Sequence, residues 1–467
     1  MRAGGSGGGA VRTRCMTDRC ATDADQPPLF PAPSPRAEGE SPRTRRAPSD
    51  PRRGARLREA SRDQLAWGRI DLDAAVPDDD PVRSIWALVG RLDLSALYAP
   101  IEARDEVAGA PAIDPKILLA LWIYATSEGE GSAREIGRLT ELHAGYRWLR
   151  GGVAVGYHTL SDFRSEHTEV FSRLITQVLA LLMQQGLVDL HRVAQDGTRV
   201  RATAGANSFR RPETLAALML QARAHLDEVT RDAADPTISA RRMAARQRGA
   251  EQRLERLEAA LAQVAEVTAT KLRSRAKDAT VRVSTTDPDA RVMKMGDGGF
   301  RPAFNLQFAT TTDAARVIVG VAVTNRGSDM GESTPMLAQI EVRTGVRPTE
   351  VLLDGGYAQH DAIDAATAQH VTVFAPVPKP RAGDARDPHV ARAGDSAAVA
   401  AWRERMGTDD AKQIYKQRAA TAETVNADAK THRGLDHVPV RGLAKALGSA
   451  TLFALTYNIL RVIALRG

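Results

Sequence analysis

The sequence predicts an all-α domain followed by an α/β domain, after an N-terminal tail that does not fold. Residues 1–60 are rich in Gly, Pro, Ser and Arg and hold few large apolar residues, so they cannot bury enough surface to fold. Over about 80–187, apolar residues recur every three or four positions, which is typical of amphipathic helices. Beyond about 188, short stretches alternate between apolar and polar residues, which is typical of half-buried strands.

These changes of pattern divide the chain into three segments. A disordered basic tail covers 1–60, a helical domain covers 61–187, and an α/β domain covers 188–467, with a helical insertion at about 206–298. The 467 residues are enough for domains with sizeable cores. The sequence contains no uninterrupted run of about 18 apolar residues, so it predicts no membrane-spanning helix.

The composition indicates a cytoplasmic protein with a basic tail. The N-terminus lacks the apolar core of a signal peptide, and both cysteines, Cys15 and Cys20, lie in the tail, which fits a reducing compartment. The net charge is +7, and the tail holds 12 Lys and Arg residues against 7 Asp and Glu residues. Such a tail can bind nucleic acid by displacing counterions. It can equally be a solvated extension, or sequence upstream of a true start at Met16.

The helical domain carries recognisable helix starts. Asp80 and Asp114 are each followed by Pro, which predicts a helix that begins at the Pro. The stretch 132–149, SAREIGRLTELHAGYRWL, predicts a short helix, a turn and a second helix. Such a helix-turn-helix can place one helix in a DNA major groove. It is also a common hairpin in plain helical bundles, so both interpretations stand.

The same domain offers further residues that could face DNA. The stretch beginning at Tyr157 predicts another helix, with Thr159 or Ser161 as its cap and with Arg164 exposed. Exposed Arg164 would suit contact with a DNA phosphate. Tyr146 and Trp148 could stack on an unpaired base, but we expect these two aromatics in the core or at its rim.

Two long charged helices interrupt the α/β domain, over 213–233 and 238–277. Leucine and valine side chains in the second helix recur at alternating spacings of three and four, which is the pattern of a coiled-coil seam; they are Leu254, Leu257, Leu261 and Val264. We expect this seam to pack an antiparallel helical hairpin rather than to specify an oligomer.

The remaining elements follow a recognisable order. Strands are predicted around Asp196 within 187–203, at 304–312, at 315–324, at 350–357 stopping at Asp354, and at 371–377, with helices between and after the later strands. This is the element order of a ribonuclease H-like domain, in which the first and fourth strands are neighbours. We therefore expect Asp196 and Asp354 to lie close together at two strand ends. On its own, the Asp196–Gly197 pair also predicts a turn.

Paired carboxylates of this kind suit divalent cations. Mg²⁺ and Mn²⁺ prefer oxygen ligands, and two such ions about 3.5–4 Å apart can serve both sides of a phosphodiester. A third acid is expected from the helix 415–435, where Glu423 and Lys430 are two turns apart and share a face. Arg418 and Glu423 are five residues apart and are predicted on different but neighbouring sides of that helix. Taken alone, this stretch is an ordinary charged helix.

Taken together, these motifs resemble the DDE transposases of bacterial insertion sequences, in the group with a Y-R-E-K signature around the last acid. QDGTRVRATA at 195–204, LLDGGY at 352–357 and the stretch 415–435 resemble its three acid-bearing motifs. The stretches LDLSALY, DPKILLALWIYA and HTLSDFR resemble the helical N-terminal domain of the same enzymes. The resemblance covers most of residues 80–467.

The resemblance implies catalytic and metal-binding roles for three acids, Asp196, Asp354 and Glu423, which would hold two Mg²⁺ or Mn²⁺ ions. It also implies DNA-contacting roles for residues of the signature and its surroundings: Tyr415, Arg418, Lys430, Arg433 and Arg164.

The last motif departs from the family pattern in two ways. Four residues instead of three separate Arg418 from Glu423, and Asn426 stands where a bulky apolar residue is frequent. Three acids that lie neither at a predicted strand end nor at a position of the signature remain as alternatives, namely Asp361, Asp364 and Asp428. His432 and His437 lie near the third acid, but no paired cysteine or histidine spacing predicts a zinc site.

The function expected from this resemblance is DNA transposition. The enzyme would cut phosphodiesters at the transposon ends and join the 3′-hydroxyl to target DNA. Its partners would be double-stranded DNA, both terminal inverted repeats and target, and a second copy of the chain, since two ends must be held together. The alternatives are a ribonuclease H-like nuclease without strand transfer and an inactive, repurposed DNA-binding protein.

Overall fold

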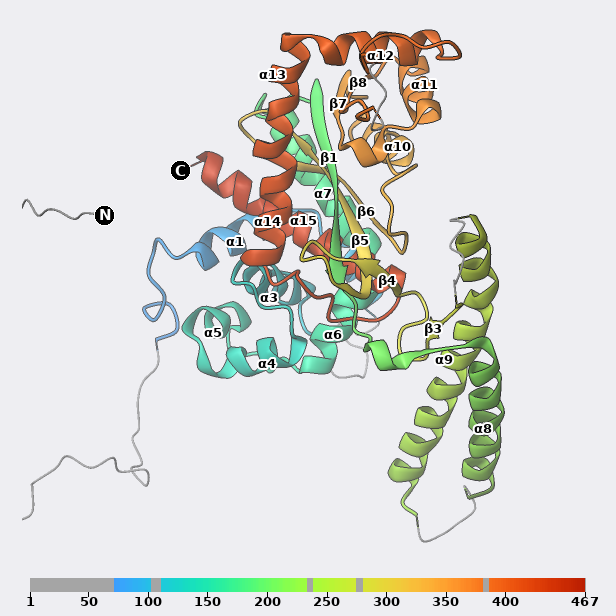
Figure 1. The fold of residues 1–467 in the computed structure, drawn as a ribbon. Coiled ribbons are helices and arrows are strands. Elements are labelled where there is room, and N and C mark those ends of the chain that lie inside the picture. The colour runs from blue at the N-terminus through green and yellow to red at the C-terminus, as the bar shows by residue number, and fades with distance from the viewer. Residues whose placement is uncertain (1–70, 102–110, 233–237, 274–279, 381–385, 467) are drawn as a thin grey trace, which may run out of the picture. The chain divides into compact units, whose positions relative to one another are not determined.

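The computed structural model contains a helical N-terminal region and a mixed β-sheet flanked by helices (Figure 1). The predicted tail, 1–60, lies outside the residues that the structure describes. Those residues are 71–101, 111–232, 238–273, 280–380 and 386–466.

The described residues of the N-terminal region form seven helices. As predicted, Asp80 and Asp114 cap two of them, since their carboxylates accept hydrogen bonds from the backbone N–H groups of Val82 and Lys116. The predicted helix-turn-helix is present as α4 and α5, joined at His143. The helices are α1 (Pro81–Val89), α2 (Ser95–Tyr98), α3 (Pro115–Ser127), α4 (Ala133–Leu142), α5 (Ala144–Arg150), α6 (Tyr157–Glu166) and α7 (Thr168–Gln184).

The start of α6 differs from the prediction. Gly156 occupies the N-cap position and no side chain caps the helix, so Thr159 and Ser161 lie inside it. Arg164 is not exposed, because it shares the inward face with Leu160 and is only 5% accessible. Its guanidinium lies 4.5 Å from the centre of the Trp122 ring. Burial lowers the pKa of Arg164 to about 10.

A six-stranded mixed sheet forms the second region. Its strands are β1 (Arg192–Arg201), β4 (Arg291–Lys294), β5 (Phe300–Thr311), β6 (Ile318–Thr324), β7 (Glu350–Leu352) and β8 (Thr372–Phe374). The order is β4-β5-β1-β7-β8, and β6 also pairs with β5. Strand β1 runs antiparallel to β5 and parallel to β7, which in turn is parallel to β8.

The first and fourth predicted strands, β1 and β7, are neighbours as expected. The detail at Asp196 differs, because β1 is one continuous strand that passes through Asp196 and stays paired with β5 as far as Arg201. Asp196 and Gly197 therefore form neither a strand end nor a turn. The pairing with β7 stops at Ala194 and Leu352, so Asp196 and Asp354 each lie two residues beyond the last pair. Asp196 and Asp354 thus lie close together, as expected, because β7 is short and not because β1 ends at Asp196.

The long interruption is a helical hairpin, as predicted. Helices α8 (Pro212–Arg231) and α9 (Ala240–Arg273) lie side by side (Figure 1) and share a small core that contains Leu215 and Leu257. Strands β2 (Phe209–Arg210) and β3 (Val283–Ser284) pair at its base. Strand β4 was not predicted, because it falls in the range expected to be a helical insertion. It pairs with β5 in the main sheet.

Helices complete the fold: α10 (Ser333–Thr344), α11 (His360–Ala368), α12 (Ala397–Gly407), α13 (Asp409–Arg418), α14 (Thr424–Thr431) and α15 (Leu443–Arg466). Among the described residues, only α15 is long and apolar enough to cross a membrane, and 72% of its apolar window is buried. It packs against α3, α7 and β6, and the Asn458 amide bonds both backbone groups of Ile318 at 2.8 Å. These contacts make α15 a core helix that joins the helical region to the sheet.

The burial of Arg164 makes it a structural residue. Replacing it in Arg164→Ala removes the stacking on Trp122 and leaves the Gly131 carbonyl without its hydrogen-bond donor. We expect the free energy of unfolding to fall by about 2–3 kcal/mol, measured by urea denaturation. Arg173→Ala on the exposed face of α7 is the control, expected to change stability by less than about 0.5 kcal/mol. Equal stability of both variants would contradict this assignment.

Candidate active site

Three carboxylates converge on the guanidinium of Arg418. Its Nη2 atom lies 2.8 Å from Asp196 Oδ1 and 4.0 Å from Asp354 Oδ2. Its Nη1 atom lies 3.0 Å from Glu423 Oε1. The side chains of Arg418 and Asp196 are only 10% and 15% exposed, so little water screens the ion pair between them. One cation therefore gathers acids that come from β1, from the segment after β7 and from the turn that follows α13.

Asp196 is the buried member of the three acids. Its Oδ1 atom accepts a hydrogen bond from the Gly197 N–H, and its Oδ2 atom accepts one from the Asn426 amide, each at 3.0 Å. Burial raises the pKa of Asp196, while Arg418 and these two donors act in the opposite direction. The carboxylates of Asp354 and Glu423 are about half exposed, at 53% and 56%. The site thus has one fixed buried anion and two anions open to solvent.

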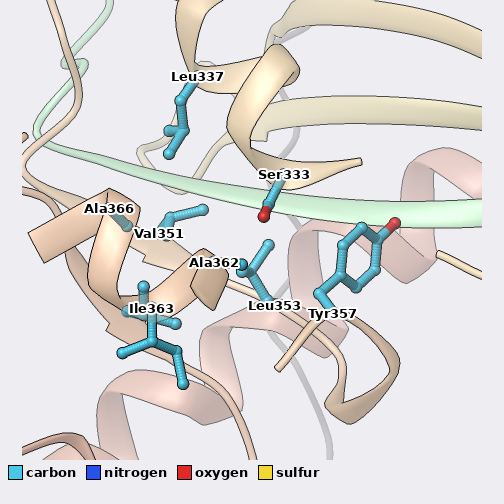
Figure 2. A pocket seen from close by; sticks show the side chains of 9 residues that line it. Ser333, Leu337, Val351, Leu353, Tyr357, Ala362, Ile363 and Ala366 are labelled. Carbon is cyan, nitrogen blue, oxygen red and sulfur yellow. The ribbon is translucent and has the colours of Figure 1, made fainter. Parts of the chain in front are cut away.

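Asp354 is positioned by the turn that follows β7. It caps a 3₁₀ helix, Gly355–Tyr357, and its Oδ1 atom accepts a 2.8 Å hydrogen bond from the Gly356 N–H. Its Oδ2 atom remains for Arg418. Figure 2 shows the pocket beside this turn, where Leu353 and Ile363 contribute to an apolar lining and the Tyr357 ring forms one wall. This packing supports the Asp354 turn.

A π-helical turn carries Glu423. Between α13 and α14 the chain forms this turn over Ala419–Glu423, which is wider than an α-helical turn. In a regular α-helix, residues five apart would point to different sides, as the sequence predicted. The wider turn instead brings Glu423 back beside Arg418. The turn thus accommodates the additional residue that the sequence shows between these two positions.

Asn426 has a direct role in the site. Its side chain is 8% exposed, and its amide N–H₂ group is the donor to Asp196 Oδ2. The bulky apolar residue that the family pattern favours at this position could not make that hydrogen bond. Asn426, which departs from the family pattern, therefore makes a polar contact with Asp196.

The charges of the acids act on Tyr415 and Lys430. Burial raises the pKa of Tyr415, Arg418 opposes that change, and the nearby Asp354 and Asp196 carboxylates raise it further. Burial lowers the pKa of Lys430, and Arg199 lowers it further, while Asp196 opposes the change. These electrostatic influences indicate that both side chains lie near the carboxylates.

The other residues singled out in the sequence lie elsewhere. Arg433 donates hydrogen bonds to Asp428 Oδ2 and to the Ser127 carbonyl, so it links the segment after α14 to α3. Of the alternative acids, Asp428 is thereby paired, Asp364 accepts a hydrogen bond from Ser396, and none of the three is an ion-pair partner of Arg418 among the described residues.

His437, Tyr146 and Trp148 make their contacts away from the acid cluster. His437 Nε2 is 3.1 Å from the Thr203 hydroxyl. Tyr146 is 2% exposed, which confirms its expected core position, and Trp148 packs partly buried at the rim, where its indole N–H donates to Asp73.

The donor set fits a hard divalent cation, although this conformation is closed around Arg418. Within the described part of the chain, no group of three or more Asp, Glu, His or Cys side chains could hold a metal ion as it stands. The guanidinium takes the central position between the carboxylates. Carboxylate oxygens are nevertheless the ligands that Mg²⁺ and Mn²⁺ prefer. A cation could therefore enter only if Arg418 moved aside.

Comparison with known families matches two parts of the chain. Residues 70–166 match the family model "Transposase domain (DUF772)", and residues 381–463 match the model "Transposase DDE domain". The second match includes Arg418, Glu423 and most of α15, but neither Asp196 nor Asp354. Neither a curated protein nor a solved structure shows significant similarity to the chain.

Gly197 is a site residue whose importance the sequence did not reveal. A Cβ atom at this position would overlap Asp329 Oδ1 and Gln307 Nε2. We expect Gly197→Ala to lower the free energy of unfolding by about 1–3 kcal/mol through overpacking, measured by urea denaturation. Gly205→Ala is the matched control, because nothing lies within 4 Å of its Cβ position. If the Gly197→Ala protein were as stable as the control, the prediction would be wrong, because Asp329 and Gln307 would have moved to make room for the added methyl group.

The stability that is lost when Arg418 is replaced should depend on pH. Arg418→Gln leaves three carboxylates without a counter-charge, so we expect a lower melting temperature than wild type at pH 7. Arg418 stabilises only ionised carboxylates, so its contribution is present at neutral pH and is lost as pH falls and they protonate. Because burial raises the pKa of Asp196, its share disappears at a higher pH than for an exposed aspartate.

The measurement is a set of thermal melts from pH 7 to pH 3.5. Lys412→Gln is the control, since this exposed residue of the same helix pairs with Asp409. A difference between wild type and Arg418→Gln that stays constant across this range would refute the proposed charge balance.

Proposed function

We propose that this chain, which belongs to the insertion-sequence DDE transposases by its matches to both family models, cuts phosphodiesters at transposon ends and joins the 3′-hydroxyl to target DNA. The observation that carries this proposal is the convergence of Asp196, Asp354 and Glu423 on one buried cation. A charge cluster of this kind is a strong indication of a functional site.

The sheet is compatible with this chemistry. Its antiparallel β6-β5-β1 portion continues into the parallel β1-β7-β8 portion, and on this basis we propose a ribonuclease H-like catalytic domain. Asp196 and Asp354 follow the neighbouring strand segments that end together at Ala194 and Leu352. This arrangement supports the pairing of the two acids with a third acid from a later helix.

Asp196, Asp354 and Glu423 would hold two Mg²⁺ or Mn²⁺ ions. When bound, such ions activate a nucleophilic oxygen and stabilise the leaving oxygen in an in-line displacement. The protein's own part is to fix the ligands. Asp196 is held by the Gly197 N–H and the Asn426 amide, so its carboxylate keeps its place when Arg418 departs.

Arg418, once released from the carboxylates, is suited to a DNA phosphate, because its planar guanidinium can donate two parallel hydrogen bonds to phosphate oxygens. The charges of the same acids act on Tyr415 and Lys430, which would contact the backbone of the same DNA end. We do not extend this role to Arg164 or Arg433, since both guanidinium groups are already engaged within the protein.

The partners follow from the reaction. The helical region α1–α7 would bind the terminal inverted repeats, and two chains would act together because two transposon ends must be held at one target. Both steps would take place in the cytoplasm, on the DNA of the nucleoid. The N-terminal tail, with its excess of Arg, would add affinity that depends on salt.

Two alternatives make different predictions about products. A nuclease of the same fold would nick the ends without joining them, and an inactive DNA-binding protein would shift the DNA without either reaction. The acids favour an enzyme, because a binding protein has no need to gather three carboxylates beside a surface meant for phosphates.

The test incubates the full chain with labelled end DNA, target DNA and Mg²⁺. We expect joined products from wild type and a loss of at least roughly 100-fold for Asp354→Asn, more than a residue behind a metal ligand would cause. Asp361→Asn, an exposed aspartate of α11, is the matched control and should retain activity. Nicks without joining would favour the nuclease, and binding without either product would favour the inactive protein.

A further inference from the structure

A buried polar cluster lies behind Asp196 on the opposite face of the sheet. Side chains alternate along a strand, so Gly197 faces away from the Asp196 side and shares its face with Gln307, its partner in β5. Asn305, two residues before Gln307, belongs to the same face and is 0% exposed, as is Gln307. The proposed reaction uses none of these side chains.

Asp329 places a fourth carboxylate in this cluster. It lies in the loop between β6 and α10, and its side chain is 14% exposed. Its Oδ1 atom accepts hydrogen bonds from the amides of Asn305 and Gln307, both at 2.7 Å. Its Oδ2 atom lies 3.6 Å from Arg199 Nη2. Three side chains therefore fix the position of this carboxylate.

Gln307 connects the Asp329 carboxylate to the turn that carries Asp354. Because its Nε2 atom donates to Asp329, its Oε1 atom is left to accept the hydrogen bond of the Tyr357 hydroxyl. Tyr357 is 1% exposed and ends the 3₁₀ helix that Asp354 caps. A chain of hydrogen bonds thus runs from Asp329 through Gln307 to the turn that carries Asp354.

Gly356 also brings the Asp354 turn close to Asp329. A Cβ atom added at Gly356 would lie 3.7 Å from Asp329 Oδ2 and 3.9 Å from Asp354 Oδ1. On the other side, Gly197 leaves the space that Asp329 Oδ1 and Gln307 Nε2 fill. Asp329 accordingly borders the segments of both the first and the second acid.

The chemistry of a carboxylate explains why this position holds Asp. A buried anion is costly unless donors surround it, and here the amides of Asn305 and Gln307 are such donors. One carboxylate oxygen can accept two N–H donors at once, which fixes the Gln307 amide in a single orientation. An Asn at position 329 would carry its own N–H₂ group, which could face either donor and release that constraint.

We propose that Asp329 is a positioning residue of the active site, which acts through Gln307 and Tyr357 to hold Asp354 in place for a divalent cation. This inference rests on the proposed function, in which Asp354 is a ligand of that cation. Asp329 itself need not touch the cation. Its effect is to keep the Asp354 turn in one orientation relative to Asp196.

The test measures Mn²⁺ binding by electron paramagnetic resonance on the full chain, without DNA. We expect Asp329→Asn to weaken Mn²⁺ binding by about 10-fold to 100-fold, the usual effect of losing a residue behind a metal ligand. Tyr357→Phe breaks the same chain at another point and should weaken binding in the same direction. The double variant should bind no more weakly than Asp329→Asn alone, because both changes interrupt one pathway.

A matched control separates positioning from stability. Asp287→Asn also alters a buried aspartate, which is 0% exposed and accepts a hydrogen bond from the Gly442 N–H, but it should leave Mn²⁺ affinity unchanged. Folding of each variant is followed by circular dichroism, and Tyr357→Phe keeps the test decisive if Asp329→Asn does not fold.

Three results would overturn the inference: wild-type Mn²⁺ affinity in the folded variants, additive effects in the double variant, or losses that only follow the unfolded fraction. A wild-type chain that binds no Mn²⁺ would overturn the proposed function as well. A wild type that binds Mn²⁺ and joins DNA, together with unaffected variants, would remove this inference alone.

Discussion

The charge balance around Arg418 is the interaction on which the acidic site depends. Three carboxylates that approach one another in a partly buried space repel strongly, because the low dielectric surroundings screen little of their charge. Arg418 offsets that repulsion with ion pairs to Asp196 and Glu423 and a longer contact to Asp354. Each acid belongs to a different segment, so a single cation couples the folding of three parts of the chain.

The charge balance around Arg418 also bears on the proposed binding of divalent ions. A site that needs a cation to assemble is stable with a guanidinium and can accept a divalent ion in its place, since both neutralise the same oxygens. The buried Asp196, with donors on both oxygens, is the fixed point of such an exchange. The half-exposed carboxylates of Asp354 and Glu423 are the two that solvent and an incoming ion can reach.

The surroundings of the acids show how the fold maintains this arrangement. On one face of the sheet, Phe308 packs against Phe453 of α15, and α15 also joins the N-terminal helices to the same core. On the other face, a buried polar layer that includes Gln307 supports the Asp354 turn. The acids therefore lie where the pairing of β1 with the short strand β7 ends, next to well-packed elements.

The sequence by itself determined the helical region, most strands and the hairpin insertion, because helix period and strand alternation are local patterns. Its resemblance to a known family singled out Asp196, Asp354, Arg418 and Glu423 as site residues. The sequence could not determine three further features. The short length of β7, rather than an end of β1, places Asp196 at the site. The π-helical turn redirects Glu423, and the inward rotation of Arg164 follows from packing on Trp122. These features, like the role of Asn426 and the Asp329 cluster, depend on contacts between residues far apart in the chain, which only tertiary packing brings together.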